Sequence, residues 1–159
     1  MQERGFSLIE LLIVVAIILL IAAIAIPNYL RSRIAANESS AAYSVRSINT
    51  AQVTYNSTYP TTGYASTLYQ LAPPPSGSSI SSTNAGILDD VLGCVTQPCT
   101  KSGYNFIITN TSGTPVSTYN VWGTPVAVGT TGSRGFCSDG SNLISFDPTG
   151  GHNCTTPLQ

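Results

Sequence analysis

The most constraining feature of this sequence is an apolar run near its start. Residues 6–26 form 21 consecutive positions with a single charged side chain, that of Glu10. As a helix that rises about 1.5 Å per residue, the run reaches roughly 30 Å, the thickness of the hydrocarbon core of a bilayer. The sequence contains no second apolar stretch of this length. We therefore expect the chain to cross a membrane once at most.

The flanking residues predict how the run is oriented. The segment before it contains Arg4, and by the positive-inside rule this end stays in the cytoplasm while the remainder is translocated. Arg31 and Arg33, beyond the run, argue weakly for the opposite orientation. An even number of Cys, four, in a chain rich in Ser, Thr and Gly also favours an oxidising compartment outside the cytoplasm.

The composition excludes several classes of protein. Charged residues make up only 8% of the chain and the formal net charge is −1, which excludes a nucleic-acid binder that relies on bulk positive charge. One His and four Cys without a Cys-x-x-Cys pair argue against a structural zinc site. His152 stands alone without a catalytic constellation around it in the sequence, so we expect no catalytic residues and no enzyme.

Three interpretations of the apolar run compete. An ordinary signal peptide could be cleaved at the A-x-A site of residues 23–25, but its apolar region usually spans only about 7–15 residues. A plain transmembrane anchor leaves Glu10 unexplained, because a carboxylate well inside a bilayer costs about 2.5–3.5 kcal/mol. The third interpretation is that Glu10 and the residues around it form a specific signal.

These residues are GFSLIELL, from Gly5 to Leu12. They resemble the type III signal of type IV pilins and type II secretion pseudopilins. That signal has a short basic leader ending in Gly, an aromatic first mature residue, a Glu four residues later, and an apolar helix with a Pro near its end, here Pro27. The resemblance implies that a prepilin peptidase cleaves between Gly5 and Phe6 and methylates the new amino group of Phe6.

Glu10 acquires a physical role in this interpretation. Cleavage leaves a free amine at Phe6, one helical turn from the Glu10 carboxylate, which lies where the helix dipole favours negative charge. The two groups could pair within one chain. Staggered helices in a filament offer a better solution, in which Glu10 of one subunit reaches the Phe6 amine of its neighbour. Because a buried charge is costly unless it is paired, this contact selects the correct stagger.

Beyond Pro27 the apolar pattern continues at helical spacing. We expect one long helix over residues 6–55, interrupted at Pro27, which lacks a backbone donor. The predicted domains are a leader, 1–5, a transmembrane and assembly helix, 6–27, and a globular head, 28–159, that includes the amphipathic half of the helix. Apolar residues recur at steps of three, four and seven, and charged residues fall elsewhere. The apolar positions are Leu30, Ile34, Ala41, Val45, Ile48 and Tyr55; the charged ones are Arg31, Arg33, Glu38 and Arg46.

The remainder predicts an α+β head. Residues 56–101 are rich in Pro, Gly and Ser, which indicates a turn-rich connector with short helices over 66–71 and, capped by Asn84, over 85–93. From Gly103 the period changes to two, which predicts antiparallel strands. The expected strands are 104–108, 117–122, 126–128, 135–138 and 143–146, with the hairpin signal Asp139-Gly140 between the last two. A long helix packed on a small antiparallel sheet is an α+β arrangement, which is also the pilin-like fold that the resemblance implies.

The four Cys residues permit three disulfide connectivities. We favour Cys94 with Cys99, which would close a small loop, and Cys137 with Cys154, which bracket the last hairpin. The second bridge would resemble the C-terminal disulfide loop of many pilins.

We expect no cofactor and no metal. Asp139 and Asp147 are weak candidates for a calcium ion, which the C-terminal loop of major pseudopilins binds. Two carboxylates eight residues apart lack the spacing of an EF-hand and are more often turn residues.

The sequence therefore predicts a structural protein, the major pilin of a type IV pilus that supports adhesion, twitching motility or DNA uptake. Its expected partners are further copies of itself in a helical filament, the prepilin peptidase and the pilus or type II secretion assembly machinery. The precursor would lie in the bacterial inner membrane and the mature subunit in a surface pilus filament. The alternative is a pseudopilin of a type II secretion system. A membrane-tethered binding module that never polymerises would share the head but would have no use for Glu10.

Overall fold

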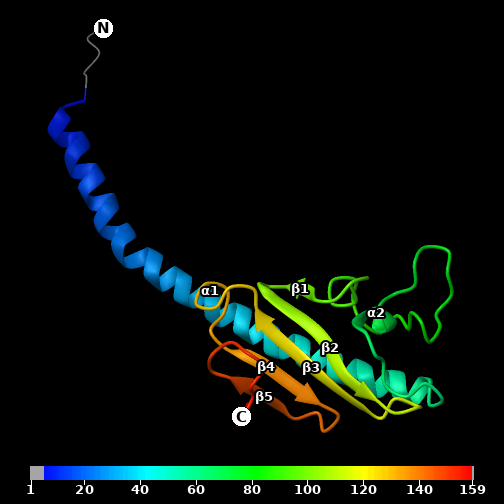
Figure 1. Cartoon of the computed structure of the whole chain (residues 1–159). Helices are drawn as coiled ribbons and strands as arrows, with labels where there is room; N and C mark the ends of the chain where they lie inside the picture. Colours follow the sequence, from blue (N-terminus) through cyan, green and yellow to red (C-terminus); the bar gives the residue numbers. More distant parts are fainter. Residues whose placement is uncertain (1–5, 159) are drawn as a thin grey trace. The chain divides into compact units, whose positions relative to one another are not determined.

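The structure, a computed structural model, describes residues 6–158 of the chain (Figure 1). The chain divides into two compact units, Met1–Arg33 and Ile34–Gln159. This boundary lies further along the chain than Pro27, where the sequence analysis placed it. Helix α1, Leu8–Thr58, contributes residues to both units. The second unit is called the head below.

Helix α1 passes through Pro27 without a break, so the predicted interruption was wrong. Pro27 withholds a single backbone N–H from the helix. The turns before and after it keep their own backbone hydrogen bonds, and propagation adds one such bond for each residue fixed, so the helical path continues. Among the described residues, α1 is the one helix long and apolar enough to cross a bilayer.

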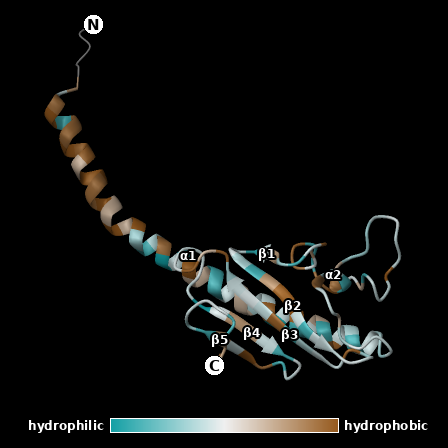
Figure 2. Ribbon diagram, in the orientation of Figure 1, coloured by the Kyte–Doolittle hydropathy of each residue, from teal (hydrophilic) through white to brown (hydrophobic). Residues whose placement is uncertain are grey.

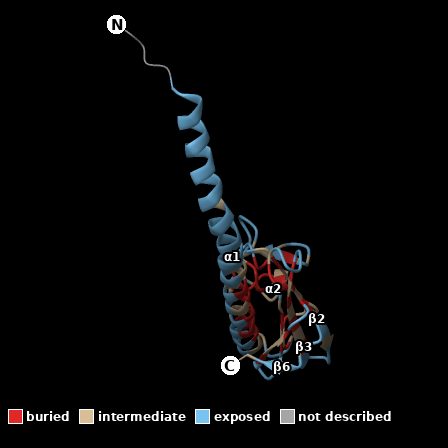
Figure 3. Cartoon of the chain, turned by 90° about the vertical axis from the view of Figure 1, so that its left-hand side faces the viewer, coloured by how far each residue is buried: buried red, intermediate tan, exposed pale blue. Residues whose placement is uncertain are grey.

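In the head, α1 packs its apolar stripe against one face of the β-sheet. Ala41, Val45, Ile48 and Tyr55 have no exposed surface, which confirms the periodicity prediction for this half of the helix (Figure 3). Leu30 lies in the other unit and is exposed. The side chains that complete this core from the sheet include Phe106, Ile108, Tyr119, Val121 and Phe136.

The sheet has six antiparallel strands in simple chain order. A long helix on an antiparallel sheet confirms the predicted α+β class. The strands are β1 (Cys99–Lys101), β2 (Tyr104–Ser112), β3 (Thr118–Pro125), β4 (Gly135–Asp139), β5 (Ile144–Asp147) and β6 (Thr156–Pro157).

Three strand assignments differ from the prediction. Strand β1 was missed, although Ser102 and Gly103 both have positive φ and join it to β2 in the two-residue hairpin that such a pair favours. The two-residue β6 was also missed. Residues 126–128 were predicted as a strand but lie in a loop, because the N–H groups of Thr130 and Thr131 both bond back to the carbonyl of Ala127 and form a turn there.

The connector contains one of the two predicted helices. Helix α2 spans Leu68–Leu71 and follows Thr67 as its N-cap. The helix predicted over 85–93 is absent. The N–H groups of Val91 and Leu92 bond to the Asp89 side chain instead of to carbonyls four residues earlier, and the N–H groups of residues 85–88 bond to carbonyls at the end of α2. The bonds run from Ala85 to Gln70, from Gly86 to Ala72, and from Ile87 and Leu88 to Leu71. The Asn84 side chain donates to the Tyr69 carbonyl and so does not cap a helix.

Candidate processing and assembly site

The first turns of α1 expose an almost unbroken apolar surface. Phe6 is 88% exposed, and every large apolar side chain of α1 before Pro27 is exposed in this single chain. Figure 2 shows this stretch as almost uniformly hydrophobic, and Figure 3 shows it as exposed. A helix that is apolar on all sides is stable only inside a membrane or packed against other helices.

Glu10 is the one charged side chain in this apolar stretch. Its Oε2 accepts a hydrogen bond of 2.9 Å from the backbone N–H of Ser7. Ser7 directly precedes the helix and Glu10 stands three positions later, which is the pattern of a capping box. This role was not predicted from the sequence, although the Ser-x-x-Glu spacing indicates it. The cap holds the carboxylate at the helix start, beside Phe6.

The structure places the other predicted processing and assembly residues as follows. Phe6 is the first described residue and precedes the cap. Gly5 and the rest of the leader lie outside the described residues, so the predicted cleavage between Gly5 and Phe6 stays a prediction. Pro27 lies within α1, about 30 Å of helix beyond Phe6 at 1.5 Å per residue.

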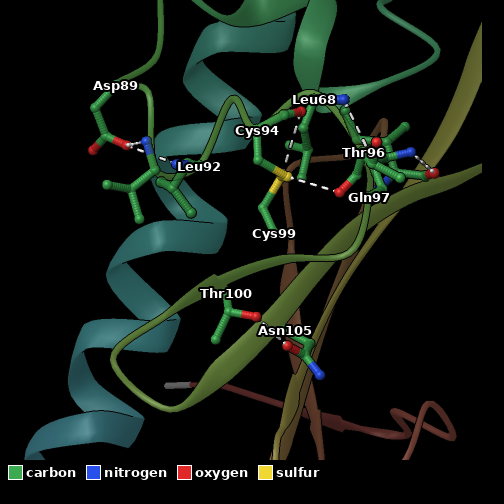
Figure 4. The surroundings of a disulfide bond; sticks show 11 residues. Leu68, Asp89, Leu92, Cys94, Thr96, Gln97, Cys99, Thr100 and Asn105 are labelled. Carbon is green, nitrogen blue, oxygen red and sulfur yellow. Dashed lines mark hydrogen bonds between the residues drawn. A yellow bond between two sulfur atoms is a disulfide. The ribbon is translucent and has the colours of Figure 1, made fainter.

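The Cys residues are joined as Cys94–Cys99 and Cys137–Cys154, the pairing favoured above. The first bridge closes a loop that contains Gln97 (Figure 4). The Gln97 Oε1 accepts hydrogen bonds from the N–H groups of Leu68, at 3.3 Å, and Ile108, at 2.8 Å. The small loop therefore fastens α2 to β2. The second bridge fixes the C-terminal tail to β4.

These bridges yield a prediction about stability. Replacing Cys137 and Cys154 by Ser should lower the free energy of unfolding of the head by about 3 kcal/mol, and replacing Cys94 and Cys99 by about 2 kcal/mol. The difference follows from loop length, because a bridge across 17 residues restricts the unfolded chain more than one across 5. Thermal unfolding would measure both losses, and non-reducing peptide mapping should find the two pairs. Free thiols on the folded protein, or a link between Cys94 and Cys137, would contradict the pairing.

An ion pair between the buried Glu38 and the half-buried Arg134 joins α1 to the loop before β4. The Glu38 Oε2 lies 2.7 Å from a terminal nitrogen of Arg134 and accepts a hydrogen bond of 2.8 Å from Arg134 Nε. Its Oε1 accepts from the N–H groups of Ser133 and Arg134. Burial alone would raise the pKa of Glu38, but these hydrogen bonds and the guanidinium charge outweigh it and hold the pKa below its ordinary value of 4.5.

The two carboxylates considered for calcium do not share a site. Asp139 ends β4 and pairs with Asn120, whereas Asp147 ends β5 and pairs with Gly135 at the other end of the hairpin. Each carboxylate accepts hydrogen bonds within its own turn, Asp139 from Ser141 and Asp147 from Thr149. No group of three metal-ligating side chains occurs among the described residues.

Comparisons with known proteins bear on the N-terminal segment. Residues 1–26 match the family described as the prokaryotic N-terminal methylation motif. A stretch of 54 residues is 46% identical to the type IV major pilin protein PilA of Myxococcus xanthus (strain DK1622). It covers 34% of this chain and 24% of that relative, so the match spans about a quarter of the relative's length. No solved structure is significantly similar to the chain.

The matched motif includes the Gly5-Phe6 junction and Glu10, the residues on which the sequence interpretation depends. The long apolar helix and the antiparallel sheet give the chain an α+β, pilin-like fold. Motif, relative and fold are consistent with one another: the N-terminal segment carries the prokaryotic N-terminal methylation motif, and 54 residues of the chain are similar to a type IV major pilin.

Proposed function

We propose that the chain is the major structural subunit of a type IV pilus and polymerises through the first half of α1. One observation carries this proposal: an exposed apolar helix with one carboxylate, held by a cap beside Phe6. Lipid can cover the apolar side chains before assembly, but it offers no partner for the carboxylate. A second copy offers both an apolar surface and, after cleavage, the Phe6 amine.

The precursor would therefore lie in the bacterial inner membrane, where the prepilin peptidase and the pilus assembly machinery act on it. The mature subunit would form a helical filament at the cell surface, for adhesion, twitching motility or DNA uptake. Its role is structural rather than enzymatic. The name of the relative, a major pilin, supports a pilus rather than a secretion pseudopilus.

Mass spectrometry of sheared surface filaments tests this function. The main subunit should begin at Phe6, carry one methyl group on its amine, and lack residues 1–5. A secreted chain that begins at Ile26 would instead restore the signal-peptide interpretation. An uncleaved chain confined to the membrane, in cells that make no filaments of it, would restore the plain anchor.

A further inference from the structure

Two arginines stand just beyond the apolar run of α1 without a partner among the described residues. Arg31 and Arg33 are both exposed. The two ion pairs within residues 6–158 use other side chains, and the sequence has no acidic residue between Glu10 and Glu38. Glu38 itself is occupied by Arg134. Two positive charges on this part of the helix are therefore left uncompensated by the chain.

The spacing along α1 places both arginines close to the depth of lipid headgroups. The apolar run, residues 6–26, reaches about 30 Å as a helix, which is the thickness of the hydrocarbon core. Each headgroup layer adds about 5–7 Å, since a whole bilayer measures about 40–45 Å. Arg31 lies five residues beyond the run and Arg33 seven. Their Cα atoms therefore lie about 7.5 Å and about 10.5 Å past the hydrocarbon core.

The direction of α-helical side chains brings both guanidinium groups closer to the bilayer. Side chains of an α-helix tilt toward its N-terminus, and for a residue that follows a membrane span this direction leads back to the membrane surface. A long arginine side chain can then place its charge at the level of the phosphates while its methylene stem covers apolar surface. Tyr29, which is 66% exposed and three residues past the run, adds the amphipathic aromatic ring typical of this depth.

Lipid fits the arrangement of the two arginines better than a single protein surface does. Positions two residues apart on an α-helix are rotated by about 200°, so Arg31 and Arg33 lie on nearly opposite sides of α1. One neighbouring protein surface would meet only one of them, whereas lipid surrounds the helix. A zwitterionic headgroup already carries its own cation, so an anionic phospholipid is the better match for two unpaired arginines. Acidic side chains of a second copy are the next candidate.

We propose that Arg31 and Arg33, with Tyr29, form an anchor that binds the phosphate groups of anionic phospholipids in the leaflet from which α1 emerges. The proposal deepens the proposed function and rests on the membrane location of the precursor. Lipid offers no partner for Glu10 near the start of the helix, but beyond the apolar run it offers one for both arginines. The anchor holds the precursor at one depth, and its lipid contacts must be exchanged when a subunit leaves the bilayer for a filament.

Spin-labelled lipids test the anchor. The full-length chain would be reconstituted in phosphatidylcholine vesicles, and electron paramagnetic resonance would compare how labelled phosphatidylglycerol and labelled phosphatidylcholine associate with it. A basic side chain near a membrane surface attracts an anionic lipid about fivefold, and part of the lipid shell touches neither arginine, so we expect an average preference of about twofold for phosphatidylglycerol. NaCl at about 1 M should largely abolish this preference, because the Debye length falls to about 3 Å. Equal association of the two lipids would overturn the proposal.

The informative variant combines Arg31→Gln with Arg33→Gln. Both positions are exposed and precede the head, so the Tm of the head should not change. The variant should lose the lipid preference except for the share that Arg4, expected on the other side of the membrane, contributes to every variant. Lys at both positions should keep most of the preference, since the charges remain. Arg46→Gln is the matched control, because Arg46 is exposed on the same helix but lies 13 residues beyond Arg33, and the preference should not change. A Gln variant with the wild-type preference would contradict the anchor.

Flotation of the vesicles separates the anchor from the proposed function. A chain that does not float with the vesicles would contradict the membrane location itself, whereas a chain that floats without a lipid preference would contradict the anchor alone. Sedimentation in a neutral detergent tests the competing partner. Self-association of the wild type that the Gln variant loses, with no difference in lipid preference between the two, would assign the arginines to a second copy and overturn the lipid assignment.

Discussion

Cells that produce only Glu10→Gln subunits should make no filaments, or very few, while the head unfolds at an unchanged temperature. The substituted side chain keeps its shape and can still accept the Ser7 N–H bond, because Gln also serves in a capping box. What is lost is the charge that pairs with the Phe6 amine of the next subunit. Leaving that amine buried and unpaired should cost about 3–5 kcal/mol at each interface.

Electron microscopy of surface filaments and mass spectrometry of their subunits measure this effect. Asp90→Asn is a suitable control, since it removes one negative charge from an exposed position of the head and should leave filament numbers unchanged. The isolated Glu10→Gln precursor should enter the membrane at least as readily as the wild type, because the substitution removes a charged side chain from the apolar segment. Normal numbers of filaments built only of Glu10→Gln subunits would show that charge pairing does not drive assembly.

Glu38→Gln should lower the free energy of unfolding of the head by about 2 kcal/mol and its Tm by about 7 °C. The carboxylate accepts one hydrogen bond from Arg134 Nε and two from backbone N–H groups, forms an ion pair with the guanidinium, and is only 10% exposed. The guanidinium also lies over the rings of Phe136 and Phe146. An uncharged amide leaves this guanidinium, which is 39% exposed, without its ion-pair partner.

The same variant should show a defined dependence on pH. Because the pKa of Glu38 in the folded head lies below 4.5, its stabilising contribution is complete above that value and is lost as the pH falls through the folded pKa. The difference in Tm between the wild type and Glu38→Gln should therefore be constant near neutral pH and narrow below pH 4.5. A difference that persists unchanged at pH 2 would contradict this assignment.

The Asp89–Lys101 pair provides a contrast within the same head. Its atoms lie just as close, at 2.7 Å, but the side chains are 51% and 31% exposed. Exposed ion pairs contribute about 0–1 kcal/mol, so Asp89→Asn should shift Tm by a few degrees at most. If Asp89→Asn and Glu38→Gln lowered the Tm of the head equally, burial of the Glu38 carboxylate would not explain why its ion pair stabilises the head more.

Much of the N-terminal unit was readable from the sequence because its signals are local. A run of apolar residues fixes a helix whatever its neighbours are, and the motif around Gly5, Phe6 and Glu10 occupies a few consecutive positions. The stripe from Ala41 to Tyr55 was equally readable, since helical spacing alone places those side chains on one face. The capping bond between Ser7 and Glu10 belongs to this class too, although it was overlooked.

The tertiary structure decided the features that depend on distant partners. Glu38 falls outside the apolar stripe, yet it is buried because the fold brings Arg134, 96 residues away, against it. Residues 85–93 were predicted as a helix, but the Asp89 carboxylate and the carbonyls at the end of α2 take their N–H groups. Trp122 and His152 meet only through the course of the C-terminal tail. Periodicity is set by neighbours along the chain, whereas each of these contacts depends on which polar and aromatic groups the folded backbone leaves within reach.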